Sequence, residues 1–188
     1  LWGVGNNEYG QLGVTSTLQT NFPIKIMDDV KAVSCGQHFS VILRTDNTVW
    51  VTGQNLAGQL GTGTNSNIST PVQVMENVKS ISAGWAHTVF LKQDNTLWVT
   101  GSNSYGQLGL VAQPASINTP EQVTAYASMA KACFNHTLVF RNDTTVLQAT
   151  GSNTYGQFGN PTLPSQSYRL LDIGGGNNLL QLSGGDGF

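Results

Sequence analysis

Apolar and polar residues alternate in short runs along the whole chain. Two examples are FSVILRT at residues 39–45 and TVWVTG at residues 48–53, both rich in Val, Ile, Thr and aromatic residues. Such alternation is typical of β-strands with one buried face. Apolar residues at helical spacing are not sustained for three turns anywhere in the sequence. The pattern therefore predicts an all-β protein.

Tight turns are predicted between pairs of these runs. The dipeptides Asp46-Asn47, Asp94-Asn95 and Asn142-Asp143 each lie between two alternating apolar segments. Asp and Asn tolerate a positive φ angle, which a two-residue hairpin turn requires. With these hairpins, each stretch of about 48 residues supplies four short strands.

One motif recurs four times and sets the organisation of the chain. Its glycines Gly5, Gly53, Gly101 and Gly151 are 48, 48 and 50 residues apart. Self-similarity at such a period indicates a repeat architecture, and four-stranded sheets repeated radially form a β-propeller. We treat residues 1–188 as one domain whose last repeat is degenerate and truncated. The copies are LWGVGNNEYGQLG at 1–13, VWVTGQNLAGQLG at 49–61, LWVTGSNSYGQLG at 97–109 and LQATGSNTYGQFG at 147–159.

Charge is scarce in this sequence. Only 10% of the 188 residues are charged, the formal net charge is −2, and the Lys and Arg residues are scattered singly. This gives no footprint for direct binding of nucleic acid. There is no apolar run long enough to span a membrane and no visible signal peptide, so we expect an intracellular location, cytoplasmic or nuclear.

The motif residues have structural interpretations. Its glycines suit positive φ angles or close approach of main chains. Asn103 can bond nearby main-chain groups, Leu108 can act as an apolar plug, and the Gln107 amide can bridge to an adjacent strand. Trp98 is expected to pack between blades. No Lys-Ser/Thr pair and no helix follow the loop, so we predict no nucleotide or other cofactor there.

The candidate chemical residues also favour structural roles. His87 and His136 occupy equivalent positions and predict a repeated hydrogen bond rather than a metal site, because no carboxylate or thiolate accompanies them. Cys35 and Cys133 are expected to be small buried thiols, with a disulfide or a reactive thiol as alternatives. The turn Asp residues explain most carboxylates, and no nucleophile with a linked base is visible. We predict that the protein is not an enzyme.

The repeats resemble a known family. Tandem G-x-N-x-x-G-Q-L-G, with Trp three residues before it and G-x-x-H-[ST] after it, is similar to the repeats of the regulator of chromosome condensation 1 (RCC1) family. The resemblance implies a seven-bladed propeller, of which about four blades are present here. The chain also begins inside a repeat unit, so we expect a segment of a longer propeller.

The informative variation lies between the Gly and the His of G-x-x-H. These turns join neighbouring strands and should lie on one face, and loops on a rigid scaffold are frequent recognition sites. Trp85 and Phe134 are candidate aromatic anchors. The residues predicted to contact a partner are Gln37, His38, Trp85, Ala86, Phe134, Asn135 and Asp186.

The function predicted from the sequence is a non-enzymatic interaction module that presents this face to a protein partner, as part of a larger protein or assembly. The resemblance implies one alternative, guanine-nucleotide exchange on a Ran-like small GTPase, in which His38 and Asp186 would occupy contact turns. A second alternative is a secreted inhibitor or effector on the same fold. The sequence has no acidic insertion between the repeats, and this absence argues against the exchange activity.

Overall fold

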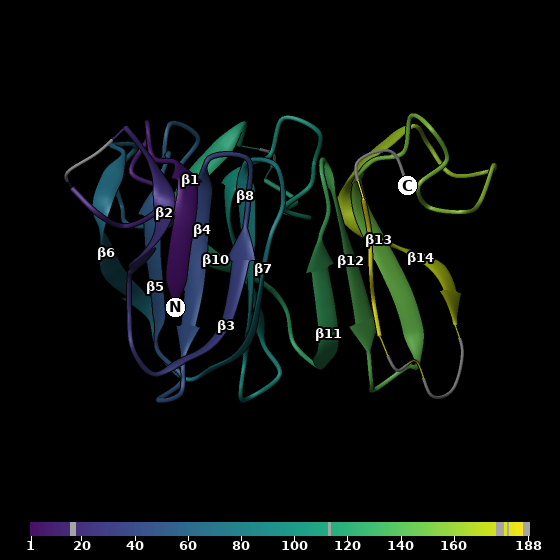
Figure 1. The fold of residues 1–188 in the computed structure, drawn as a ribbon. Coiled ribbons are helices and arrows are strands. Elements are labelled where there is room, and N and C mark those ends of the chain that lie inside the picture. The colour runs from purple at the N-terminus through teal and green to yellow at the C-terminus, as the bar shows by residue number, and fades with distance from the viewer. Residues whose placement is uncertain (16–17, 113, 176–178, 180, 186–188) are drawn as a thin grey trace.

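The computed structural model describes residues 1–15, 18–112, 114–175, 179 and 181–185. Within these ranges the chain forms fourteen strands and no helix, so the all-β prediction is confirmed (Figure 1). The strands are β1 (Trp2–Asn6), β2 (Gln19–Lys25), β3 (Val30–Cys35), β4 (Phe39–Arg44), β5 (Val49–Gly53), β6 (Ile68–Met75), β7 (Val78–Ala83), β8 (His87–Lys92), β9 (Leu97–Ser102), β10 (Ser116–Thr124), β11 (Ala127–Ala132), β12 (His136–Arg141), β13 (Val146–Ser152) and β14 (Gln166–Gly175).

The strands pair in chain order into antiparallel sheets. β1 and β2 form a two-stranded sheet, and three four-stranded sheets follow with the orders β3-β4-β5-β6, β7-β8-β9-β10 and β11-β12-β13-β14. The first strands of successive sheets contact one another, β3 against β7 and β7 against β11. These strands therefore lie nearest to the axis of the arc, and the predicted four-stranded blades of a partial propeller are confirmed.

Each four-stranded sheet combines strands from two successive sequence repeats. β3 and β4 end the repeat that starts at residue 1, whereas β5 and β6 begin the repeat that starts near residue 49. The second repeat continues into β7 and β8 of the next sheet. Each of the first three repeats therefore joins two neighbouring sheets.

Two of the predicted hairpin turns have the expected geometry. Asn47 and Asn95 have φ angles of 64° and 66°. Asp46 Oδ1 accepts hydrogen bonds from the hydroxyl and the main-chain N–H of Thr48, and these bonds hold the pKa of Asp46 below its usual value. In the third hairpin the positive φ angle, 52°, falls on Thr145, the last residue of the loop between β12 and β13, rather than on Asn142 or Asp143.

The apolar core lies between the sheets. One cluster joins Phe39, Val41 and Val51 of the first four-stranded sheet to Phe90 of the second, and Trp98 packs against it. A second cluster joins the second and third four-stranded sheets and contains Leu108. The predicted inter-blade position of Trp98 and the apolar plug at Leu108 are therefore confirmed.

The glycine-rich loops require glycine where they meet the next sheet. At Gly58 the φ angle is +78°, and a Cβ atom would lie 2.5 Å from the main-chain oxygen of Ile117 and 2.6 Å from the Asn118 Cα. Gly156 occupies the same motif position with φ +80°, yet no described atom lies within 4 Å of a Cβ placed there. The two glycines therefore have nearly the same positive φ angle, but of the two only Gly58 has the described main chain of another strand close to the position of a Cβ atom.

We therefore expect Gly58→Ala to destabilise the protein more than Gly156→Ala. Both changes place an L-residue in the left-handed region, at a cost of about 1–2 kcal/mol. Gly58→Ala adds a main-chain clash, worth about a further 1–3 kcal/mol. Chemical denaturation of both variants measures the difference in the free energy of unfolding. Equal losses would contradict the close approach seen at Gly58.

Candidate functional site

The repeated asparagine closes each glycine-rich loop. Asn103 Oδ1 accepts a hydrogen bond from the Leu108 N–H at 3.0 Å, and its Nδ2 donates to the Pro114 oxygen at 2.9 Å. Equivalent pairs of bonds occur at Asn55 and Asn153. The loop-holding role predicted for this residue is confirmed.

The repeated glutamine acts differently from the prediction. Gln107 Oε1 accepts a hydrogen bond from the Tyr105 N–H within its own loop, at 2.9 Å. The link to the next sheet runs instead through the main-chain oxygen of Gln107, which accepts a hydrogen bond from the Thr137 hydroxyl at 2.7 Å. The expectation that the Gln107 amide bridges to an adjacent strand is therefore wrong, because the amide is already used to close the loop.

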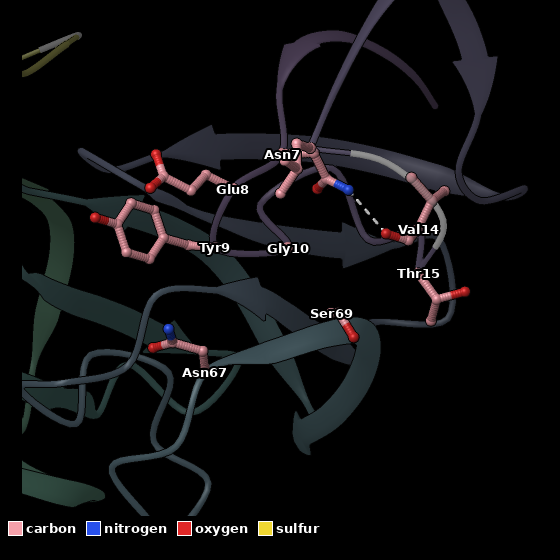
Figure 2. A pocket seen from close by; sticks show the side chains of 9 residues that line it. Asn7, Glu8, Tyr9, Gly10, Val14, Thr15, Asn67 and Ser69 are labelled. Atoms are coloured by element: carbon pink, nitrogen blue, oxygen red, sulfur yellow. Dashed lines mark hydrogen bonds between the residues drawn. The ribbon is translucent and has the colours of Figure 1, made fainter.

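The first glycine-rich loop lines a hollow of about 390 Å³ (Figure 2). Asn7 Nδ2 donates to the Val14 oxygen at 2.8 Å across this loop. The Leu12 and Tyr9 N–H groups donate to the side chains of Asn7 and Gln11. These loop N–H groups are thus bound inside the loop, whereas a phosphate-binding loop leaves its N–H groups free for the ligand.

His87 forms a buried bond between two sheets. Its Nε2 lies 3.0 Å from Thr137 Oγ1 of β12. Burial, and secondarily the charge of His136, lowers the pKa of His87 to about 3. The structural hydrogen bond predicted from the repeated histidines is confirmed at His87.

The other two histidines lack this bond. His136 is buried, and its Nε2 has no hydrogen-bond partner among the described residues. Burial also lowers the pKa of His136. His38 stacks on Tyr9 with ring centroids 4.8 Å apart. In the described ranges no group of three or more His, Cys, Asp or Glu side chains is placed to hold a metal ion.

The G-x-x-H turns lie side by side at one end of the inner strands. The Gln37 N–H donates to the Trp85 oxygen at 3.2 Å, and the Trp85 N–H donates to the Phe134 oxygen at 3.1 Å. Main-chain hydrogen bonds thus connect three turns that are about 50 residues apart in the sequence. The positions of their side chains relative to one another are set by the backbone.

Three of the predicted contact residues share one hollow. Gln37, Trp85 and Phe134 line a depression of about 370 Å³, together with Cys35 and Cys133, which we call the axial hollow. The rings of Trp85 and Phe134 lie 4.3 Å apart at an interplanar angle of 55°, and Trp85 is 39% exposed. This aromatic pair is the main apolar feature of the hollow.

The other described residues predicted to contact a partner do not line the axial hollow. Asn135 lines a neighbouring hollow, and the Ala86 main-chain oxygen accepts a hydrogen bond from the Ser102 N–H. His38 lies against Tyr9 rather than in the axial hollow. Asp186 lies outside the described residues. The structure thus brings together three predicted residues directly and a fourth next to them.

Two tyrosines complete this surface, and sequence reasoning missed them. Tyr105 and Tyr155 line the neighbouring hollow of about 380 Å³ with Phe134 and Asn135, and we call it the tyrosine hollow. A signal was present, because a tyrosine precedes the second glycine of the motif in three of its four copies.

The two cysteines differ from the expected buried pair. Both are free thiols, but Cys35 is exposed and only Cys133 is buried. Burial raises the pKa of Cys133 to about 11, so this thiol stays protonated at neutral pH. Because the thiolate is the reactive form, Cys133 is a poor nucleophile.

The architecture defines a repeat-built β-propeller, and comparison with protein families gives its family. Two models of the regulator of chromosome condensation (RCC1) repeat match the chain, one at residues 1–43 and 46–91, the other at residues 30–59 and 78–107. Together they cover more than half of the sequence. The chain belongs to the RCC1 repeat family.

Solved structures with similar folds agree with this assignment. Human WBSCR16 has a TM-score of 0.80 at 22% identity, covering 91% of this chain and 46% of its own. Prp20p from Saccharomyces cerevisiae has a TM-score of 0.81 at 20% identity, covering 99% of this chain and 49% of its own. The chain therefore spans about half the length of these proteins. A search among functionally characterised proteins found no match.

No helix in the described part of the chain is long and apolar enough to cross a membrane.

Burial of His87 predicts a pH dependence of stability. Its pKa is lowered from 6.5 to about 3 on folding, so between these values the unfolded state binds more protons. The free energy of unfolding should therefore fall as the pH drops below 6.5, with His87 contributing up to about 1.4 kcal/mol per pH unit. Denaturant titrations at several pH values should show a shallower slope for His87→Gln.

A matched variant separates titration from loss of the hydrogen bond. Thr137→Val removes the partner hydroxyl but leaves His87 buried, so it should lower stability and retain the wild-type pH slope. An unchanged slope in His87→Gln would show that this histidine is not the titrating group.

Proposed function

We propose that this protein is a non-enzymatic interaction module that binds a protein partner through the end carrying the G-x-x-H turns. The observation that carries the proposal is the convergence of Gln37, Trp85 and Phe134 on one hollow at the axis. These residues come from three different blades, so only the assembled arc presents them together.

The chemistry of this surface supports binding. Exposed aromatic side chains contribute large contact areas and are frequent anchors of protein interfaces. Trp85 and Phe134 are held by a rigid antiparallel scaffold, and their turns are joined by main-chain hydrogen bonds. Little conformational entropy is then lost when a partner orders these residues.

The groups around the axial hollow do not suit acid–base catalysis. Among its described lining residues the titratable side chains are Cys35, Cys133 and Lys131. The raised pKa of Cys133 keeps that thiol neutral, and the described residues that line this hollow include no carboxylate or histidine to act as a base. The titratable side chains of the axial hollow therefore support a binding role rather than acid–base catalysis.

Proteins of similar fold have protein partners. The structure of Prp20p from Saccharomyces cerevisiae was described with its binding properties to Gsp1p and histones, and yeast RCC1 (Prp20) was solved bound to Kap60. The exchange-factor alternative for this chain depends on His38 and Asp186. His38 stacks on Tyr9, and Asp186 lies outside the described residues, so we favour the binding module.

Removing the aromatic pair tests this proposal. We expect the double variant Trp85→Ala/Phe134→Ala to lose its captured protein partners by at least about tenfold, because truncating central aromatic anchors commonly costs about 2 kcal/mol or more. The measurement is quantitative affinity capture of wild-type and variant protein from the same cell extract.

Tyr126→Ala is the matched control. Tyr126 is an exposed aromatic residue between β10 and β11, at the opposite end of the strands. This variant should recover the same partners as the wild type, and thermal melts should show that all proteins are folded. Equal recovery by the double variant would mean that another surface binds the partner.

A further inference from the structure

The two ends of the arc differ in charge. The motif end carries the G-x-x-H turns and the loops after β1, β5, β9 and β13, because antiparallel strands place these connections together. Among the described residues of these connections the only charged side chain is Glu8. The opposite, hairpin end holds most of the carboxylates, which are Asp28, Asp29, Asp46, Glu76, Asp94, Asp143 and Asp172.

Aromatic side chains at the motif end have unused hydrogen-bond donors. The indole N–H groups of Trp50 and Trp98 donate internally, to Thr48 and Thr96 at 3.0 and 2.9 Å. By contrast, the Trp85 indole N–H and the hydroxyls of Tyr105 and Tyr155 make no hydrogen bond to any described residue. Each of these rings therefore combines an apolar face with a free donor.

These rings surround two adjoining hollows. Phe134 lines both the axial hollow and the tyrosine hollow, so it forms the ridge between them. Trp85 lies on one side of this ridge, and Tyr105 and Tyr155 lie on the other. The volumes, about 370 and 380 Å³, are nearly equal. The surface thus offers two similar aromatic sites in succession.

We propose that this surface binds an uncharged, proline-rich segment of the partner in the polyproline II conformation. Proline has no main-chain N–H, so a proline-rich segment presents carbonyl acceptors and apolar rings. Its polyproline II helix has no internal hydrogen bonds and leaves these carbonyls open. Aromatic-lined grooves recognise such segments because the extended helix is already formed before binding. This inference rests on the proposed function and names the chemistry of its partner.

The observations favour this ligand over other classes. A charged peptide would find few opposite charges, because the charged side chains among the described motif-end connections and the axial hollow are only Glu8 and Lys131. A neutral oligosaccharide could stack on the rings, but each of its hydroxyls also brings a donor that needs an acceptor. The Trp85 indole N–H makes no hydrogen bond to any described residue, and an indole N–H can only donate. It therefore matches a ligand whose main chain offers only hydrogen-bond acceptors.

Direct binding of a synthetic peptide tests the inference. The probe is a fluorescent oligoproline of about ten residues, which spans roughly 30 Å as polyproline II. A Gly-Ser peptide of equal length is the flexible control, and a linear neutral oligosaccharide is the competing ligand. Fluorescence anisotropy should show saturable binding of oligoproline only, with an affinity that is unchanged at high salt because no ion pair is formed.

Two variants test whether the aromatic residues of the hollows bind the peptide, and a third variant is the control. Tyr155→Phe keeps the ring and removes the donor, so it should weaken binding about threefold to tenfold, the value of one hydrogen bond. Trp85→Ala should abolish saturable binding. Tyr126→Phe removes a hydroxyl from an exposed tyrosine at the hairpin end and should bind like the wild type.

The failing outcomes are distinct. Absence of saturable binding to oligoproline, unchanged binding in Trp85→Ala, or binding of the oligosaccharide alone would each overturn the proline-rich assignment. If oligoproline fails while Trp85→Ala/Phe134→Ala still loses its captured partners, the proposed function stands and only the ligand chemistry is wrong. If the double variant keeps its partners, the proposed function itself fails.

Discussion

The close contact between each of the first three glycine-rich loops and the next sheet is the constraint on which the structure depends. Thr100 Oγ1 lies 2.8 Å from the Gly58 oxygen and 3.1 Å from the Ile117 oxygen, so one hydroxyl joins a loop to a sheet strand. Thr52 and Thr150 make the same pair of contacts in the neighbouring repeats. This spacing leaves no room for a Cβ at the glycine. The motif therefore needs glycine, and the facing strand needs threonine.

This spacing also places the surface that we propose to be functional. Once the sheets are held at this separation, Ser82 Oγ can accept the Ala132 N–H at 3.0 Å, and His87 can reach Thr137. The inner strands then end at the same level, and their turns form the hydrogen bonds that join Gln37, Trp85 and Phe134. The repeated residues set the geometry, while the side chains of the turns are free to differ between blades.

The sequence was sufficient to predict the fold because its signals are local. Asp46 and Asp94 bond their own turns, and Asn103 bonds its own loop, so each residue type acts within a few positions of itself. Features that depend on how two sheets meet were not accessible. The exposure of Cys35 and the place of Tyr105 beside Phe134 depend on how neighbouring blades meet, which alternation and spacing do not describe.

The scarcity of charge among the described residues of the motif end, where Glu8 is the one charged side chain of the connections, has two different causes. Gln59, Leu60 and Gln107 are buried, and a charge at these positions would be desolvated at a large cost. That explanation does not apply to Leu56 and Tyr105, which are 67% and 45% exposed although the next sheet lies against their loops. A charged side chain would be hydrated there, as carboxylates are at the hairpin end. Folding alone thus leaves these aromatic and apolar residues unexplained, whereas the contact with an uncharged partner that we propose would account for them.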